Sequence, residues 1–155
     1  MQNTSPTPAA ELDDTLVKFA QEGLLKELGL HSNDVKAGLM LAKSQLDAGR
    51  VERALQIYCG LILLSPQEPE TQLGLANCAL QSQQYELTMR AAAAGMVLAP
   101  QDPRGFYFSG AAAIALGHLA EAKEDLADAV ELAKAAKQAD IAMAAQKLLS
   151  GLSAV

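Results

Sequence analysis

Apolar and small residues recur along most of this chain at a fixed interval, the step from Pro66 to Pro100. Five further columns repeat at the same interval. The columns are Gly49, Gln83 and Gly117; Ala54, Thr88 and Ala122; Ala42, Ala76 and Gly110; Tyr58, Ala92 and Leu126; and Leu61, Gly95 and Ala129. This 34-residue period is typical of arrays of helical hairpins, in which each repeat packs on its neighbours. The pattern therefore predicts an all-α fold of three tandem hairpins.

The rest of the hydrophobic pattern divides the chain into six units. The predicted units are a disordered leader at residues 1–8, an amphipathic N-terminal helix at 9–31, three repeats at 35–68, 69–102 and 103–134, and a capping helix at 137–150. The leader is polar and holds two prolines, so it has nothing to bury. The N-terminal helix ends at Gly29, a common stop signal. The capping helix is expected to cover the exposed face of the third repeat.

The first helix of each hairpin is expected to line the concave wall of a right-handed superhelix. Counting from helix starts near Val35, Pro69 and Pro103 gives the residues on this wall. They are Lys36, Leu39, Lys43, Leu46, Glu70, Leu73, Asn77, Leu80, Arg104, Tyr107, Ala111 and Ile114. Most are apolar, and an uncovered apolar strip favours an apolar peptide ligand, to whose backbone Asn77 could hydrogen-bond. Alternatively, the N-terminal helix or a neighbouring subunit covers the strip.

Composition and charge exclude several classes of function. The 155 residues are 50% hydrophobic, enough for one domain with a core. Eighteen acidic residues against twelve basic ones give a net charge of −6, and the basic residues are scattered, which argues against nucleic acid as a partner. No apolar run approaches the roughly 18 residues of a membrane span, and the start does not resemble a signal peptide. We therefore expect a cytoplasmic protein that does not insert into membranes.

The chain offers no recognisable catalytic or metal site. Cys59 and Cys78 stand alone, without a second cysteine or a histidine at ligand spacing, and are expected to be small, buried apolar residues in a reducing compartment. His31 and His118 lie beside turns. None of the common nucleophile, nucleotide-binding or zinc-protease motifs is present. We expect no catalytic residue, no metal, no cofactor and no enzymatic activity.

Several segments resemble a known family. The repeating columns resemble the tetratricopeptide repeat, and the middle of the chain is similar to the class II chaperones of type III secretion, of the SycD/LcrH type. The segments that carry this resemblance are Leu73 to Cys78, Gln84 to Glu86, Asp102 to Arg104, Phe106 to Phe108, Leu116 to Ala122 and Ala129 to Ala133. The order of elements, one leading helix followed by three repeats, agrees as well.

The resemblance implies a cytoplasmic chaperone of hydrophobic translocator proteins. Such a chaperone would hold an extended translocator segment in its concave groove until export, without nucleotide. Many members of the family form homodimers through the N-terminal helix, which implies a dimer interface at Leu12, Leu16 and Phe19 of this chain.

Other functions remain open at this stage. The chain could be a general tetratricopeptide adaptor between folded proteins, or a chaperone for another secreted protein such as a needle subunit. A clamp for acidic C-terminal peptides would need several converging basic residues, and only Arg104 is suitably placed. A small enzyme is the least supported alternative, because no catalytic motif is present.

Overall fold

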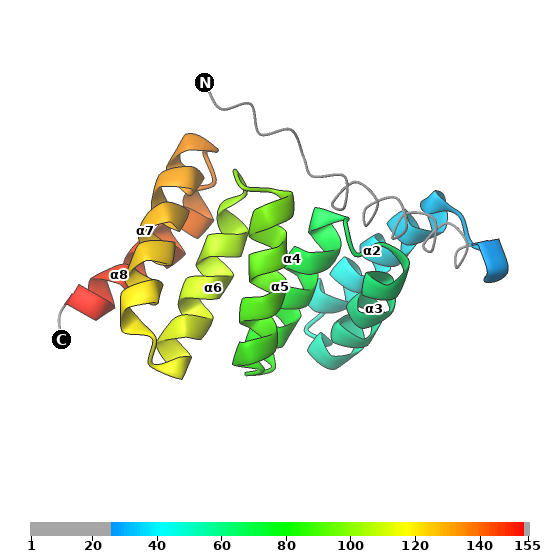
Figure 1. Ribbon diagram of the computed structural model, residues 1–155, viewed down its shortest axis with the longest axis horizontal. Coiled ribbons are helices and arrows are strands. Elements are labelled where there is room, and N and C mark those ends of the chain that lie inside the picture. Colours follow the sequence, from blue (N-terminus) through cyan, green and yellow to red (C-terminus); the bar gives the residue numbers. More distant parts are fainter. Residues whose placement is uncertain (1–25, 154–155) are drawn as a thin grey trace, which may run out of the picture.

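The fold is an array of helices stacked in chain order. The structure, a computed structural model, describes residues 26–153 and places seven helices there. They are α2 (Ser32–Asp47), α3 (Val51–Leu64), α4 (Pro69–Gln81), α5 (Tyr85–Leu98), α6 (Pro103–Leu116), α7 (Leu119–Ala135) and α8 (Ala139–Ser153). The array runs from α2 and α3 at one end to α7 and α8 at the other (Figure 1). The predicted all-α fold of tandem hairpins is confirmed.

Part of the predicted organisation lies outside the described residues. This applies to the leader at residues 1–8, to most of the N-terminal helix, and to the predicted dimer contacts at Leu12, Leu16 and Phe19. At the other end, the predicted capping helix is α8, which packs against α7. Within residues 26–153 no helix is long and apolar enough to cross a membrane.

Local signals in the sequence explain where the helices begin and turn. Pro69 and Pro103 open α4 and α6, where a missing amide hydrogen costs no intrahelical bond. The turns within the three hairpins use the same left-handed backbone conformation, with φ of 74° at Gly49, 58° at Gln83 and 81° at Gly117. Glycine adopts this conformation freely, whereas Gln83 does so at a cost of about 1 kcal/mol. The turn residue therefore recurs once per repeat because each hairpin needs a left-handed backbone conformation at that position.

Small residues let the helices approach closely enough to stack. Ala42, Ala76 and Ala122 are fully buried. Between the first and second hairpins, the ring of Tyr58 on α3 occupies the space in which Gly74 of α4 would carry a side chain. Burial is the main cause that raises the pKa of Tyr58 to about 12, so the phenol stays neutral at physiological pH. The contact between these two hairpins is thus an uncharged aromatic ring packed on a glycine.

This packing makes Gly74 a sensitive position. We expect Gly74→Ala to lower the free energy of unfolding by about 1–3 kcal/mol, because the added methyl overlaps the buried ring of Tyr58. Gly60→Ala is the matched control, since Gly60 lies within α3 and a Cβ there would meet no atom within 4 Å. The control should be neutral or stabilising by up to about 1 kcal/mol. Urea unfolding of both variants tests this, and equal stabilities would contradict the packing described.

Candidate peptide-binding site

The inner wall of the array can be identified from which helices touch. The first helices of successive hairpins contact one another, α2 with α4 and α4 with α6. Among the described residues no contact joins α3 to α5 or α5 to α7. In a curved stack the elements on the inside lie closer together than those on the outside. Helices α2, α4 and α6 therefore form the inner wall, as the sequence predicted, and the second helices form the outer face.

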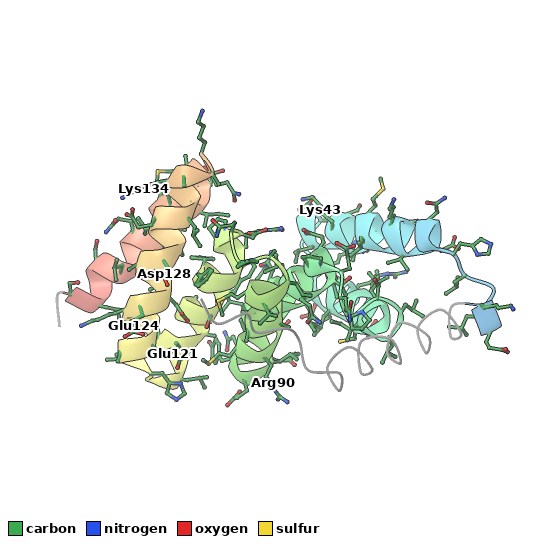
Figure 2. All side chains as sticks on the ribbon, turned by 45° about the horizontal axis from the view of Figure 1, so that its top comes forward. Lys43, Arg90, Glu121, Glu124, Asp128 and Lys134 are labelled. Carbon is green, nitrogen blue, oxygen red and sulfur yellow. The ribbon has the colours of Figure 1, made fainter. Side chains whose placement is uncertain are left out.

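Figure 2 shows the two faces through their labelled charges. Lys43 of α2 lies at the upper edge of the array in this view, and Arg90 of α5 lies at the lower edge. Helix α7, at one end of the array, carries three labelled acidic residues, Glu121, Glu124 and Asp128. Arg90, Glu121, Glu124 and Asp128 of the second helices thus lie lower in this view than Lys43 of α2, whereas Lys134, at the C-terminal end of α7, lies near the upper edge as Lys43 does.

Most residues predicted to line the wall are accessible to a ligand. Lys36 and Lys43 are exposed. The partly exposed residues are Leu39, Leu46, Glu70, Asn77, Leu80, Arg104, Tyr107, Ala111 and Ile114. The leucines, Tyr107 and Ile114 also pack against the two hydrophobic clusters beneath the wall. Packing on the core holds these side chains in place, and the part of each that faces away from the core is exposed to solvent.

Leu73 was wrongly predicted to line this surface. Its side chain is only 1% exposed, so a ligand on the wall cannot reach it. The reason lies on the neighbouring helix, where Gly95 stands in the column that holds Leu61 and Ala129 in the other repeats. A Cβ on Gly95 would lie 2.6 Å from Cδ2 of Leu73, so the leucine fills the space that the glycine leaves. Leu73 is a core residue between α4 and α5.

The side chain of Arg104 is bonded to the carboxylates of Glu70 and Asp102 and is therefore not free to bind a ligand. Its Nη1 and Nη2 donate to the carboxylate of Glu70 at 3.0 and 2.8 Å, and Glu70 lies at the same place in the preceding repeat. Its Nε and Nη2 also donate to Asp102 at 3.1 and 2.8 Å. The hydrogen bond to Asp102 is the largest cause that raises the pKa of Arg104. Burial alone would raise the pKa of the Asp102 carboxyl, but Arg104 outweighs it and holds that pKa below its usual value.

These bonds change how the wall meets a charged ligand. Arg104, Glu70 and Asp102 together carry one negative charge, and four of the five guanidinium hydrogens are engaged in the bonds to the two carboxylates. A ligand carboxylate would therefore gain little attraction here. The hypothesis that the protein binds acidic C-terminal peptides depended on Arg104, and these bonds remove its support.

The remaining polar groups on the wall are suited to a peptide backbone. The Asn77 Oδ1 accepts a hydrogen bond from Gln81 Nε2 at 2.9 Å, a bond that uses neither hydrogen of the Asn77 amide nitrogen. Lys43 lies 3.5 Å from Asp47, but both side chains are about two-thirds exposed and the pair is weak. Both groups can thus donate to backbone carbonyls, which sets the register of a bound chain without requiring a particular side chain.

A hollow lies at one end of the wall, between α2, α4 and α6. It has a volume of about 380 Å³ and is lined by Leu39, Met40, Lys43, Glu70 and Arg104. Sequence reasoning did not name Met40, which is 74% exposed. It also missed the pairing of Glu70 with Arg104, although opposite charges at matching positions of successive repeats were a usable signal. Its volume leaves room for an apolar side chain of moderate size.

Comparisons with known proteins support the fold. No protein-family model matches the chain, and no curated protein matches it by sequence. Among solved structures, it is similar to PcrH from Pseudomonas aeruginosa bound to the chaperone binding region of PopD, with 24% identity, a TM-score of 0.75 and coverage of 81% of this chain and 96% of that one. SycD from Yersinia enterocolitica, in complex with a YopD peptide, is 25% identical, with a TM-score of 0.72 and coverage of 79% and 95%.

A third similar structure is a type III secretion complex from Aeromonas hydrophila. It is 24% identical, with a TM-score of 0.78 and coverage of 91% of this chain and 96% of that one. The three matches cover nearly the full length of the known chains. The chain therefore has the fold of the type III secretion translocator chaperones, and the resemblance drawn from the sequence is confirmed at the level of the fold.

The connection between Glu70, Arg104 and Asp102 should contribute to stability. We expect Arg104→Gln to lower the free energy of unfolding at pH 7 by about 1–2 kcal/mol, since it leaves two partly buried carboxylates without their partner. Lys43→Gln is the control, because it removes an exposed pair worth at most about 0.5 kcal/mol. Urea unfolding of both variants measures the difference.

The effect of Arg104→Gln should also depend on pH. Arg104 lowers the pKa of Asp102 in the folded state below the value of about 3.9 expected for the unfolded chain. The stability that this pair contributes is therefore present above about pH 4 and is lost as the pH falls through the lowered pKa. The gap between wild type and Arg104→Gln should narrow from pH 7 to pH 2.5. A constant gap would mean that Asp102 is not the coupled group.

Proposed function

We propose that this protein is a cytoplasmic chaperone for hydrophobic translocator proteins of a type III secretion system. It binds an extended segment of its client along the inner wall and keeps that client soluble before export. The observation that carries the proposal is the wall itself, on which Leu39, Leu46, Leu80, Tyr107 and Ile114 remain partly exposed in a chain of net charge −6. Contiguous apolar surface of this kind marks a binding site in a soluble protein.

The structural neighbours favour this class of client. SycD was solved with a peptide of the translocator YopD, and PcrH with the chaperone binding regions of PopD and PopB. This chain shares their fold over nearly their full length. By analogy, we assign it the same kind of ligand, an apolar segment of a secreted translocator.

The physical task of such a chaperone is to prevent aggregation. A protein that must later insert into a membrane carries apolar segments that would associate or insert prematurely if left free. The wall offers such a segment apolar contacts, while Asn77 and Lys43 can bond to its backbone. Binding and release then require no nucleotide and no chemistry, and we propose that the protein is not an enzyme.

The two cysteines fit a reducing compartment. Cys78 is fully buried, and burial is the main cause that raises the pKa of its thiol to about 11. Such a thiol is unreactive at neutral pH. Cys59 is also free, but it is exposed on α3, so the prediction that both cysteines are buried is wrong for this one. Among the described residues no group of histidine, cysteine and acidic side chains could hold a metal ion.

The first functional test is recovery of the client from cells of the source organism. The tagged protein should co-purify with one or two proteins that contain long apolar segments, as identified by mass spectrometry. Leu39→Glu with Ala111→Glu should reduce recovery at least tenfold, because it places two charges on the wall where apolar anchors bind. Val97→Glu is the control, since Val97 is 82% exposed on the outer helix α5.

The outcome separates the proposal from the general adaptor. Circular dichroism and urea unfolding must first show that the Leu39→Glu, Ala111→Glu protein is folded. If the recovered partners were soluble folded proteins and bound equally to wild type and to this variant, the chain would be an adaptor and the chaperone proposal would be wrong.

A homodimer is also part of the proposal, with Leu12, Leu16 and Phe19 at the interface. Their spacing in the sequence puts them on one side of a helix. Leu16→Glu with Phe19→Glu should convert the dimer to a monomer, as measured by size-exclusion chromatography with light scattering. Lys18→Glu changes a residue between them that the same spacing puts on another side, and should leave the dimer intact. A dimer that persisted in the double variant would remove this segment from the interface.

A further inference from the structure

The last helix stands where a fourth repeat would place its first helix. Helix α8 packs against α7, as α6 packs against α5 and α4 against α3. It also contacts α6, in the way that α6 contacts α4 and α4 contacts α2. The inner wall, defined by these contacts between first helices, therefore continues from α6 onto α8.

The sequence columns of the wall continue onto α8 as well. One repeat length beyond Tyr107 stands Ile141, and the same step from Ile114 leads to Leu148. Ile141 and Leu148 are partly exposed, as are Tyr107 and Ile114. The residue between them, Ala145, is fully buried and follows Ala111 by the same step.

Apolar packing is continuous between α6 and α8. Leu148, together with Leu149 and Leu152, packs in the same hydrophobic cluster as Tyr107 and Ile114. Leu148 of α8 thus lies beside the wall residues of α6. The wall columns run from the exposed lysines of α2 to the partly exposed Ile141 and Leu148 of α8.

We infer that α8 is a fourth binding helix of the groove, and that Ile141 and Leu148 contact the apolar end of the client segment. This inference rests on the proposed function. The occupant is an extended polypeptide with apolar side chains at its α8 end, because Ile141 and Leu148 present partly exposed apolar side chains there. Its backbone carbonyls or acidic side chains would lie at the α2 end, where Lys36 and Lys43 are exposed.

The fourth helix also sets the length of the bound segment. Packed helices lie about 8–10 Å apart, and an extended chain advances about 3.3 Å per residue. Each helix therefore spans about three residues of ligand. A groove that ended at α6 would hold about six residues between its outermost helices, and one that includes α8 holds about nine.

Site-specific photo-crosslinking tests this inference. The photoreactive residue p-benzoylphenylalanine would replace Lys43, Tyr107 or Ile141, one at a time, in the full-length tagged protein expressed in the source organism. Met143 is the control on the same helix, because it is 65% exposed but lies two residues from Ile141, off the wall columns. After irradiation, mass spectrometry identifies the client residue attached at each position.

The expected result is crosslinks from Lys43, Tyr107 and Ile141 to one client segment, in that order along the chain. The residues attached at Tyr107 and Ile141 should be about three apart, and the yield at Met143 should be at least fivefold lower. Crosslinks from Lys43 and Tyr107 without one from Ile141 would overturn the role of α8 and leave the proposed function standing. An equal yield at Met143 would also overturn it. No client crosslink at any wall position would contradict the proposed function itself.

Discussion

The whole structure depends on the close approach of helices at small residues. Ala42, Ala76 and Ala122 are completely buried, and a side chain on Gly110 would overlap Leu126 of α7. None of the hairpins could bury its apolar surface alone, so stability comes from contacts with the next hairpin. Because the residues that make these contacts recur at one fixed period, each hairpin is placed on the previous one in nearly the same way. The curvature of the array, and with it the inner wall, follows from this regular packing.

The apolar side chains of the inner wall are packed on the core on one side and exposed to solvent on the other. Packing on the core fixes their positions before a ligand arrives. Fixed positions reduce the entropy lost on binding, so modest apolar contacts can hold a flexible client segment. The bonds from Arg104 to Glu70 and Asp102 link the second and third hairpins and engage the one positive charge that α4 and α6 bring to the wall. The wall along α4 and α6 is thus suited to an apolar peptide and poorly suited to an acidic one.

Periodicity predicted most of this architecture but not all of the site. The turn, proline and small-residue columns gave the hairpins, because each reflects a local backbone or packing requirement. Helical spacing alone could not place Leu73, whose burial depends on the missing side chain of Gly95 on another helix. It also could not show that Arg104 is held by two carboxylates. For α8, the step of one repeat from Tyr107 to Ile141 was present in the sequence, but only the contact with α6 places this helix on the wall.

The most direct test of the inner wall as the binding surface is an NMR titration. The protein would carry labelled methyl groups on Ile, Leu and Val, and would be titrated with a synthetic peptide of the client segment identified by crosslinking. Methyl signals of Leu39, Leu46, Ile114 and Ile141 should shift, while those of Leu63 and Val97, exposed on the outer helices, should not. Shifts confined to Leu63, Val97 and their neighbours would place the ligand on the outer face and contradict the account.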